Sequence, residues 1–292
     1  MSYSLKPWET LSQLINTENR SEVAKFIDDL STSETARAIS RLSEEEQQAL
    51  FTILSPENAA DVIEDISETQ AAGVVENLPS EQAAAIMEEL DSDHLVDVLG
   101  EMDSDASESI LSQMEPDDAE EARTLLNYPP DSAGGLMISE FLAFQVDDTI
   151  QDVLDDLQEN QTRYRNYNVQ YFFVVEHDKR LAGVLRVHDL LFPARQTRLS
   201  DIMIRSPLCV SDQASLAELE IFFDEHKLLG VPVVDSDRHL VGLVLPRFVE
   251  EAISKQKTKA FLRLSGIIGG EEFRTMPLAV RSGRRLSWLS MN

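Results

Sequence analysis

The chain has 292 residues and a formal net charge of −28, from 53 Asp and Glu against 25 Lys and Arg. This acidic balance argues against a nucleic-acid-binding protein, which needs the opposite sign. The lone cysteine, Cys209, excludes an internal disulfide, and no run of about eighteen apolar residues is present to cross a membrane, so the sequence predicts a soluble chain of two or three domains.

An apolar residue recurs at every twelfth position of the first 126 residues. The series is Leu30, Leu42, Leu54, Ile66, Leu78, Leu90, Met102, Met114 and Leu126. Two companion series begin at Phe26 and Ile27, and the spacings of one, three and four between the series are those of one apolar helix face. Each unit therefore holds one short helix and a turn. Helices this short need neighbours, so we expect a superhelix of stacked helices over residues 20–127.

The turns between these units carry helix-start signals. One column of the repeat holds Ser31, Ser43, Ser55, Ser67, Pro79, Asp91, Asp103 and Glu115. Serine and aspartate are N-cap residues because a side-chain oxygen accepts a free backbone N–H. Ser31 with Glu34, and Ser43 with Glu46, have the spacing of a capping box.

The second half of the chain is a tandem repeat that begins after the Pro- and Gly-rich segment 128–135. Met137 matches Met203 at an offset of 66, whereas Phe172 matches Val231 at an offset of 59, so seven extra residues of the first copy lie within 159–169. Each copy predicts a strand, a helix capped by Thr149 or Ser215, two strands joined by a tight turn, and a final helix. The turns are 177–180 and 236–239.

These two copies resemble a pair of CBS domains, and the whole arrangement resembles the cytosolic region of the MgtE family of magnesium transporters and channels. The motifs that carry the resemblance are Tyr128-Pro-x-Asp131-Ser-Ala133-Gly134-Gly135-Leu136-Met137, Val231-Pro-Val-Val-Asp235 and Leu240-Val-Gly242. The resemblance implies a multidomain fold class: an all-α superhelix of short helices, an α/β tandem CBS pair and a C-terminal linker helix. The predicted domains are 1–128 (helical N domain), 129–195 and 196–252 (CBS domains), and 253–292 (basic linker helix and pre-membrane segment).

Three acidic residues, Asp93, Asp97 and Glu101, are spaced four apart, on one face of a predicted helix. The resemblance implies that such carboxylates bind Mg²⁺ together with acidic residues of the second CBS domain and of the following helix. Asp61 in an earlier repeat, Asp224 and Glu251 complete the candidate metal set. An ordinary solvated helix face explains the same pattern, and this alternative stays open.

The final segment departs from the acidic pattern that the resemblance implies. Residues 251–292 hold eight Lys or Arg against three Glu, and Lys255, Lys257 and Lys259 occupy the linker helix. We hypothesise that these lysines partly replace Mg²⁺ as counter-charges to the helical domain. The basic pair Arg284-Arg285 and Trp288 are typical of a segment approaching a membrane, although an ordinary basic tail is the alternative.

Asp189 is the candidate nucleotide-binding residue. The resemblance implies that CBS pairs often hold adenine nucleotides and that an aspartate at this position grips the ribose. The preceding hydroxyl position is occupied by Arg186, however, and a plain helix cap explains Asp189 equally.

The sequence therefore predicts a regulatory, Mg²⁺-sensing region that gates a transmembrane pore outside this chain. The implied cofactors are Mg²⁺ and ATP, and the implied partners are the pore domain of the same protein and a second copy, joined as a homodimer through the CBS domains. The implied location is the cytoplasmic face of the inner membrane. No catalytic motif is present, the five histidines are scattered, and no enzyme is expected. A stand-alone adenine-nucleotide-binding regulator and a scaffold protein are the alternatives.

Overall fold

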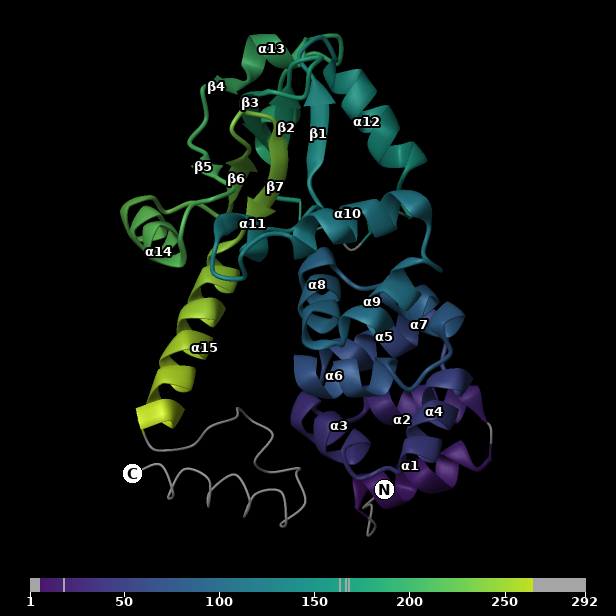
Figure 1. Ribbon diagram of the computed structural model, residues 1–292. Helices are drawn as coiled ribbons and strands as arrows, with labels where there is room; N and C mark the ends of the chain where they lie inside the picture. Colours follow the sequence, from purple (N-terminus) through teal and green to yellow (C-terminus); the bar gives the residue numbers. More distant parts are fainter. Residues whose placement is uncertain (1–5, 18, 163, 166, 168, 265–292) are drawn as a thin grey trace. The chain divides into compact units, whose positions relative to one another are not determined.

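The computed structural model describes residues 6–17, 19–162, 164–165, 167 and 169–264. The chain divides into two compact units, of which the first includes residues 1–127 and the second consists of 128–258. The first unit is all-α and the second is α/β, as Figure 1 shows. This confirms the predicted fold class.

The first unit is a succession of short helices. They are α1 (Pro7–Ile15), α2 (Arg20–Asp28), α3 (Thr32–Ile39), α4 (Glu44–Ile53), α5 (Pro56–Glu64), α6 (Glu68–Val75), α7 (Ser80–Met87), α8 (Ser92–Glu101), α9 (Ser104–Leu111) and α10 (Pro116–Leu126). From α3 onward each helix begins twelve residues after the previous one. One helix therefore fills each repeat, as the apolar period predicts.

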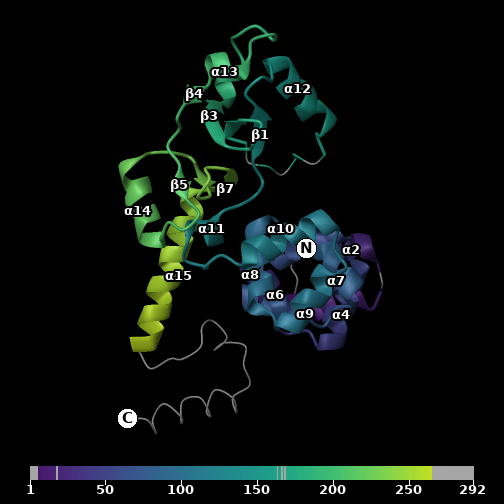
Figure 2. The same cartoon turned by 45° about the horizontal axis from the view of Figure 1, so that its top comes forward.

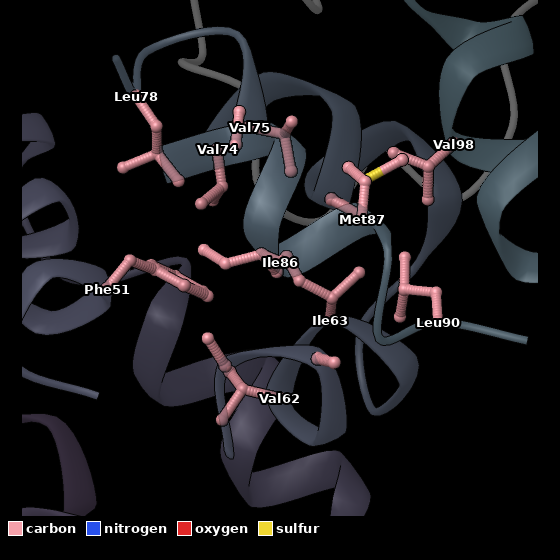
Figure 3. Packing of buried hydrophobic residues seen from close by; sticks show 14 of the residues in the cluster. Phe51, Val62, Ile63, Val74, Val75, Leu78, Ile86, Met87, Leu90 and Val98 are labelled. Atoms are coloured by element: carbon pink, nitrogen blue, oxygen red, sulfur yellow. The ribbon is translucent and has the colours of Figure 1, made fainter. Parts of the chain in front are cut away.

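These helices pack chiefly against the helix two places further along the chain. The pairs α5–α7, α6–α8, α7–α9 and α8–α10 are the main contacts of the second half of the unit. In Figure 2 the helices lie around a common centre, which is what such alternate stacking produces. One continuous core runs through the unit, and Figure 3 shows Phe51, Ile63 and Ile86 pointing into it from three different helices. Burial of this shared core stabilises helices that are too short to persist alone.

The serine caps form as predicted in the first repeats. Ser43, Ser55 and Ser67 accept a backbone N–H of the helix that follows, and Ser43 completes a capping box with Glu46. Ser31 instead donates its backbone N–H (3.1 Å) and its hydroxyl (2.7 Å) to Glu34. The later residues of the same column also occupy the N-cap position, but their side chains make no capping hydrogen bond. These residues are Pro79, Asp91, Asp103 and Glu115.

A second type of contact stabilises those later turns. The backbone N–H of Asp103 donates to Glu76 (3.0 Å), and twelve residues further the N–H of Glu115 donates to Glu88 (2.6 Å). A carboxylate from about two repeats earlier thus accepts a backbone donor at the start of α9 and of α10. The N–H paired in this way is that of the N-cap residue itself, which in a capping box bonds to the side chain three residues further on.

The second unit contains two small sheets flanked by helices. Its elements are α11 (Ala133–Leu136), β1 (Leu142–Gln145), α12 (Ile150–Glu159), β2 (Tyr171–Val175), β3 (Leu181–Arg186), the 3₁₀ helix η1 (Val187–Leu190), α13 (Leu199–Ile202), β4 (Ile204–Arg205), β5 (Val210–Ser211), α14 (Leu216–Glu225), β6 (Val231–Val234), β7 (Leu240–Val244) and α15 (Pro246–Leu264). The strand orders are β1-β2-β3-β4 and β5-β6-β7. In each sheet the first pair is parallel and the next pair is antiparallel.

The predicted likeness of the two copies is visible element by element. Thr149 and Ser215 cap α12 and α14 through capping boxes. The additional residues of the first copy lie in 160–170, between α12 and β2. Lys179 and Arg238, which are 59 residues apart, take the same left-handed conformation in the two hairpin turns (φ 66° and 68°).

Each sheet also pairs with the residues that precede the first helix-flanking strand of the other copy. Ile138, which precedes β1, forms a bridge with Leu243 of β7. At the corresponding place, Ile204 in β4 pairs with Val184 of β3. The predicted domain limits at 128, 195 and 252 follow sequence likeness and stay predictions, whereas hydrogen bonding joins the copies across residue 195. The two copies therefore form one interlocked pair.

Helix α15 begins two residues after the end of β7, and its residues up to Thr258 belong to the second unit. Its residues from Ser254 to Thr258 are all exposed, and Lys255 lies 3.8 Å from Glu251 one turn earlier. None of the helices in the described part of the chain combines the length and the apolar character required to cross a bilayer. The predicted pre-membrane residues Arg284, Arg285 and Trp288 lie outside the described residues.

Replacing Ile86 by alanine tests the dependence of the first unit on its shared core. Ile86 is 1% exposed, so Ile86→Ala should lower the free energy of unfolding by about 2–5 kcal/mol through lost burial and the cavity left behind. Gln48→Ala is the control, because Gln48 is an exposed, uncharged residue of α4 in the same unit. Urea unfolding followed by circular dichroism measures both. Equal effects of the two variants would contradict the account of a continuous, close-packed stack.

Candidate functional site

The three acidic residues of the predicted metal helix lie on α8. The apolar residues Leu95, Val98 and Leu99 are buried and turn the opposite face of this helix into the core. Asp97 and Glu101 are exposed and Asp93 is half-buried. Like charges at this spacing repel by about 0.2–0.5 kcal/mol per pair on an isolated helix, so a bound cation would be stabilising there. Thr69 of α6 donates to Glu101 at 3.2 Å.

Asp61 lies on the neighbouring acidic helix α5. Val62 and Ile63, which follow it, point into the core (Figure 3), and Asp61 itself is exposed. It lines an open hollow of about 90 Å³ together with Asp28 and Asp65. Partial burial, followed by the negative charges of Glu64, Asp28, Asp65 and Glu57, raises the pKa of Asp61. The raised pKa thus reflects the partial burial of Asp61 first and the surrounding carboxylates second.

One histidine, which was not predicted as a site residue, connects these two helices. The Nδ1 atom of His94 on α8 is 3.7 Å from the carboxylate of Glu64 on α5, an ion-pair distance that is longer than a hydrogen bond. Contact with Glu64 is the main cause, and the charges of Asp93 and Asp91 add to it, while burial opposes the shift; together they raise the pKa of His94 to about 9. His94 is therefore a cation at neutral pH, beside the predicted metal ligands.

The remaining candidate metal ligands lie on two helices of the second unit. Asp224 is exposed near the end of α14, and Glu251 is exposed on α15 beside Lys255. Within the described residues, none of the six predicted ligands belongs to a group of three whose ligand atoms come within 4.8 Å of one another. The structure therefore places Asp93, Asp97 and Glu101 on one helix face and leaves the other three on separate elements.

The group that does meet that distance was not predicted as a metal site. Asp235, Asp237 and His239 lie in the turn between β6 and β7. Asp235 accepts the backbone N–H groups of Asp237 (2.9 Å) and His239 (2.8 Å), and its other oxygen lies 2.9 Å from Nδ1 of His239. These contacts close the hairpin turn, and they account for the proximity of the three side chains.

Asp189 lies in η1, and its carboxylate is already occupied by neighbours. Arg186 donates to it from its backbone N–H (2.9 Å), from Nε (3.1 Å) and from Nη2 (3.1 Å). His188 lies 3.0 Å away. Arg186 holds the pKa of Asp189 below its usual value, and the Asp189 side chain is 18% exposed. Asp189 thus accepts the backbone N–H at the start of η1, as a capping residue does. Arg186, which occupies the position where the resemblance implies a hydroxyl, also forms an ion pair with it.

The pH dependence of stability tests the position of His94. Its pKa is raised from 6.5 to about 9, so the charged form stabilises the folded state. That contribution is complete below pH 6.5 and is lost as the pH rises through 9. Without divalent cations, the urea midpoint should fall over this range more steeply for the native chain than for His94→Gln. Because 45% of the side chain is exposed, solvent screening keeps the effect small. Parallel pH profiles would contradict the ion pair.

Two family models match this chain. The model of the MgtE intracellular N domain matches residues 30–131, and the CBS domain model matches residues 133–192 and 199–247. The first match lies on the short-helix unit and the other two lie on the interlocked pair. Partial matches to inosine-5'-monophosphate dehydrogenases, such as that of Nitrosopumilus maritimus, cover 22% of that enzyme and 38% of this chain.

Three curated relatives are magnesium transporters. The MgtE protein of Enterococcus faecalis is 29% identical over 174 residues, which are 59% of this chain and 37% of that protein. The MgtE protein of Thermus thermophilus is 29% identical over 147 residues, which are 50% of this chain and 32% of that protein. The chain thus spans about a third of the length of these relatives.

Two solved structures share the fold over most of the chain. The soluble part of a magnesium transporter superposes with a TM-score of 0.73 and 24% identity, covering 86% of this chain and 98% of that one. The cytosolic domain of the Mg²⁺ channel MgtE, in complex with ATP, superposes with a TM-score of 0.73 and 25% identity, covering 84% and 99%. Given these matches to both of its units, the chain belongs to the MgtE family, of which it comprises the helical N domain and the CBS pair.

Proposed function

We propose that this chain is the regulatory, Mg²⁺-sensing region of a magnesium transporter, at the cytoplasmic face of the inner membrane. In this proposal it gates a transmembrane pore of the same protein, since the similar relatives are magnesium transporters of which the match covers only 37% and 32%. The role is regulatory and not catalytic, because the family matches span both units and the enzyme matches extend over only part of the chain.

The observation that supports metal sensing is the large excess of negative over positive charge in the first unit, which the charge of His94 offsets only in small part. Residues 55–126 hold 21 Asp and Glu against one Arg, Arg123, and that arginine is paired with Glu108 at 2.7 Å. The pKa of Asp61 is raised because burial and neighbouring carboxylates disfavour its charge. Mg²⁺ is a hard cation that prefers carboxylate oxygen and keeps several water ligands, so it suits carboxylates that are near one another without being in mutual contact.

Gating then follows from population shift. A cation biases a two-state protein only by binding one state more tightly than the other. In our proposal Mg²⁺ bound at Asp93, Asp97, Glu101 and Asp61 favours a closed arrangement, to which Asp224 and Glu251 of the second unit contribute ligands. The lysines of α15 supply part of the counter-charge, so closure depends on ionic strength as well as on Mg²⁺.

Neutralising the α8 carboxylates tests this proposal. The triple variant Asp93→Asn, Asp97→Asn, Glu101→Gln should raise the Mg²⁺ concentration at the midpoint of compaction by roughly tenfold or more, equivalent to about 1.4 kcal/mol. Small-angle scattering of the 292-residue chain during a Mg²⁺ titration measures the radius of gyration.

A charge-matched variant is the control for this titration. Asp118→Asn, Glu120→Gln, Glu121→Gln removes the same three charges from exposed positions of α10. It should leave the midpoint close to that of the native chain. Equal shifts in the two triple variants would mean that only net charge matters, and a native chain whose radius ignores Mg²⁺ would contradict the sensor proposal itself.

We propose an adenine nucleotide as a second ligand of the CBS pair. The similar MgtE cytosolic domain was solved in complex with ATP, and Asp189 of this chain lies in η1 directly after β3. Binding through Asp189 requires the ribose to compete with Arg186, which already donates three hydrogen bonds to that carboxylate. Nucleotide binding without any response to Mg²⁺ would favour the alternative of a stand-alone nucleotide regulator.

Calorimetry with ATP and with AMP tests the role of Asp189. Asp189→Asn should weaken binding by roughly tenfold or more, because a hydrogen bond to a charged group is worth about 1.5–3 kcal/mol. Asp178→Asn, in the exposed hairpin turn of the same copy, should leave the affinity unchanged. Unchanged binding by Asp189→Asn would show that Asp189 serves only as the cap of η1.

We also propose a homodimer joined through the CBS pair. The second unit exposes several large apolar side chains, which a single copy leaves in contact with water. The most exposed are Phe192 (84%), Leu191 (71%), Leu229 (60%) and Ile221 (59%). Exposed apolar groups of this size favour an interface.

A further inference from the structure

The chain enters the second unit through a segment that is attached to the second CBS copy. This segment, residues 128–138, follows directly on the last residue of the first unit, Asn127. Sequence order would place it on the first copy, whose strands follow it. The hydrogen bonds place it on the second copy instead, at both of its ends.

The first half of the segment is bonded to the β5–α14 connection. Ala133 donates its backbone N–H to Ala214 (2.7 Å), and Gly134 donates to Asp212 (2.8 Å). In return Leu216, the first residue of α14, donates to Asp131 (2.9 Å). Three backbone hydrogen bonds within four residues fix the position of this half on the second copy.

The second half of the segment is bonded to β7. Ile138 and Leu243 each donate a backbone N–H to the other, both at 2.9 Å. Met137 is 4% exposed and packs over Gly242, where an added Cβ would lie 2.4 Å from its sulfur. Glycine at 242 is therefore required for the close approach of the segment to β7.

Strand β7 continues almost at once into α15. Leu243 is three residues before Pro246, where α15 begins. A displacement of the segment reaches α15 through one pair of hydrogen bonds and three residues of chain, without passing through the first copy. Figure 1 shows α15 leaving the same sheet that contains β7.

The first copy contains the same contact without the same continuation. Met203 packs over Gly183 of β3, where an added Cβ would also lie 2.4 Å from sulfur. Strand β3, however, leads into η1 and then into the connection to the second copy. The two copies therefore contain the same contact between a methionine and a glycine. Only the contact of Met137 with Gly242 lies on the path of the chain from the first unit to α15.

We propose that residues 128–138 transmit the state of the helical unit to α15, with Met137 and Ile138 on β7 as the positioning residues. This rests on the function proposed above and names its route. The second CBS copy is the carrier of the magnesium signal, and the first copy is held outside that route, where a ligand bound to it acts as a modulator.

Hydrogen exchange of the 292-residue chain, with and without Mg²⁺, tests this route. In the native chain Mg²⁺ should slow exchange in α8 and change exchange in α15. The variants are made in a Glu251→Gln parent, which removes the metal ligand proposed on α15 itself and should keep both responses. In its Met137→Ala derivative the α8 response should remain and the α15 response should be lost. In Met203→Ala both responses should remain. Met137→Leu, which conserves volume, should restore the α15 response and excludes general misfolding as its cause.

The outcomes separate this inference from the proposed function. A native chain in which Mg²⁺ leaves α8 exchange unchanged would overturn the sensor function. An α8 response in the native chain without an α15 response would overturn the transmission. An α15 response that survives in Met137→Ala, or that is lost equally in Met203→Ala, would overturn the assigned route while leaving the sensor function intact.

Discussion

The first unit depends on the burial of one apolar stripe from each of a series of helices too short to be stable alone. Because a twelve-residue repeat fixes which positions face the core, the remaining positions face water and are free to carry charge. In residues 55–126 this chain places 21 Asp and Glu against one Arg, and neighbouring carboxylates add to the burial that raises the pKa of Asp61. The packing that stabilises the stack thus also holds the negative side chains at fixed spacings, which is the property that a cation sensor requires.

The sequence was informative where the determinants are local. The apolar period predicted one helix per repeat, and Ser43, Ser55 and Ser67 cap their helices as expected. It was less informative where partners lie far along the chain. Asp103 and Glu115 occupy the cap column, but the backbone donors there are satisfied by Glu76 and Glu88, 27 residues earlier. His94 was missed for the same reason, since its partner Glu64 lies on another helix.

The CBS pair shows a similar division. Internal offsets of 66 and 59 predicted two like copies and the position of the longer loop, because those features follow from likeness alone. The similarity of the two copies does not predict which sheet residues 128–138 pair with. The pairing of Ile138 with β7 is shown only by the hydrogen bonds of the structure. That attachment makes the second copy the point where the chain enters from the helical unit and leaves through α15. For the candidate metal ligands, helical spacing predicted that Asp93, Asp97 and Glu101 share one face of α8, whereas Asp61, Asp224 and Glu251 lie on three other helices, which local spacing does not relate to α8.

The most direct measurement of the central claim is equilibrium dialysis of the chain against Mg²⁺, with metal analysis at two concentrations of potassium chloride. Specific coordination by grouped carboxylates predicts a small, saturable number of bound ions that survives the higher salt, because inner ligands are screened less than diffuse surface charge. Uptake that never saturates, or that disappears at the higher salt, would show that the acidic surface attracts only a diffuse ion atmosphere and would contradict the account.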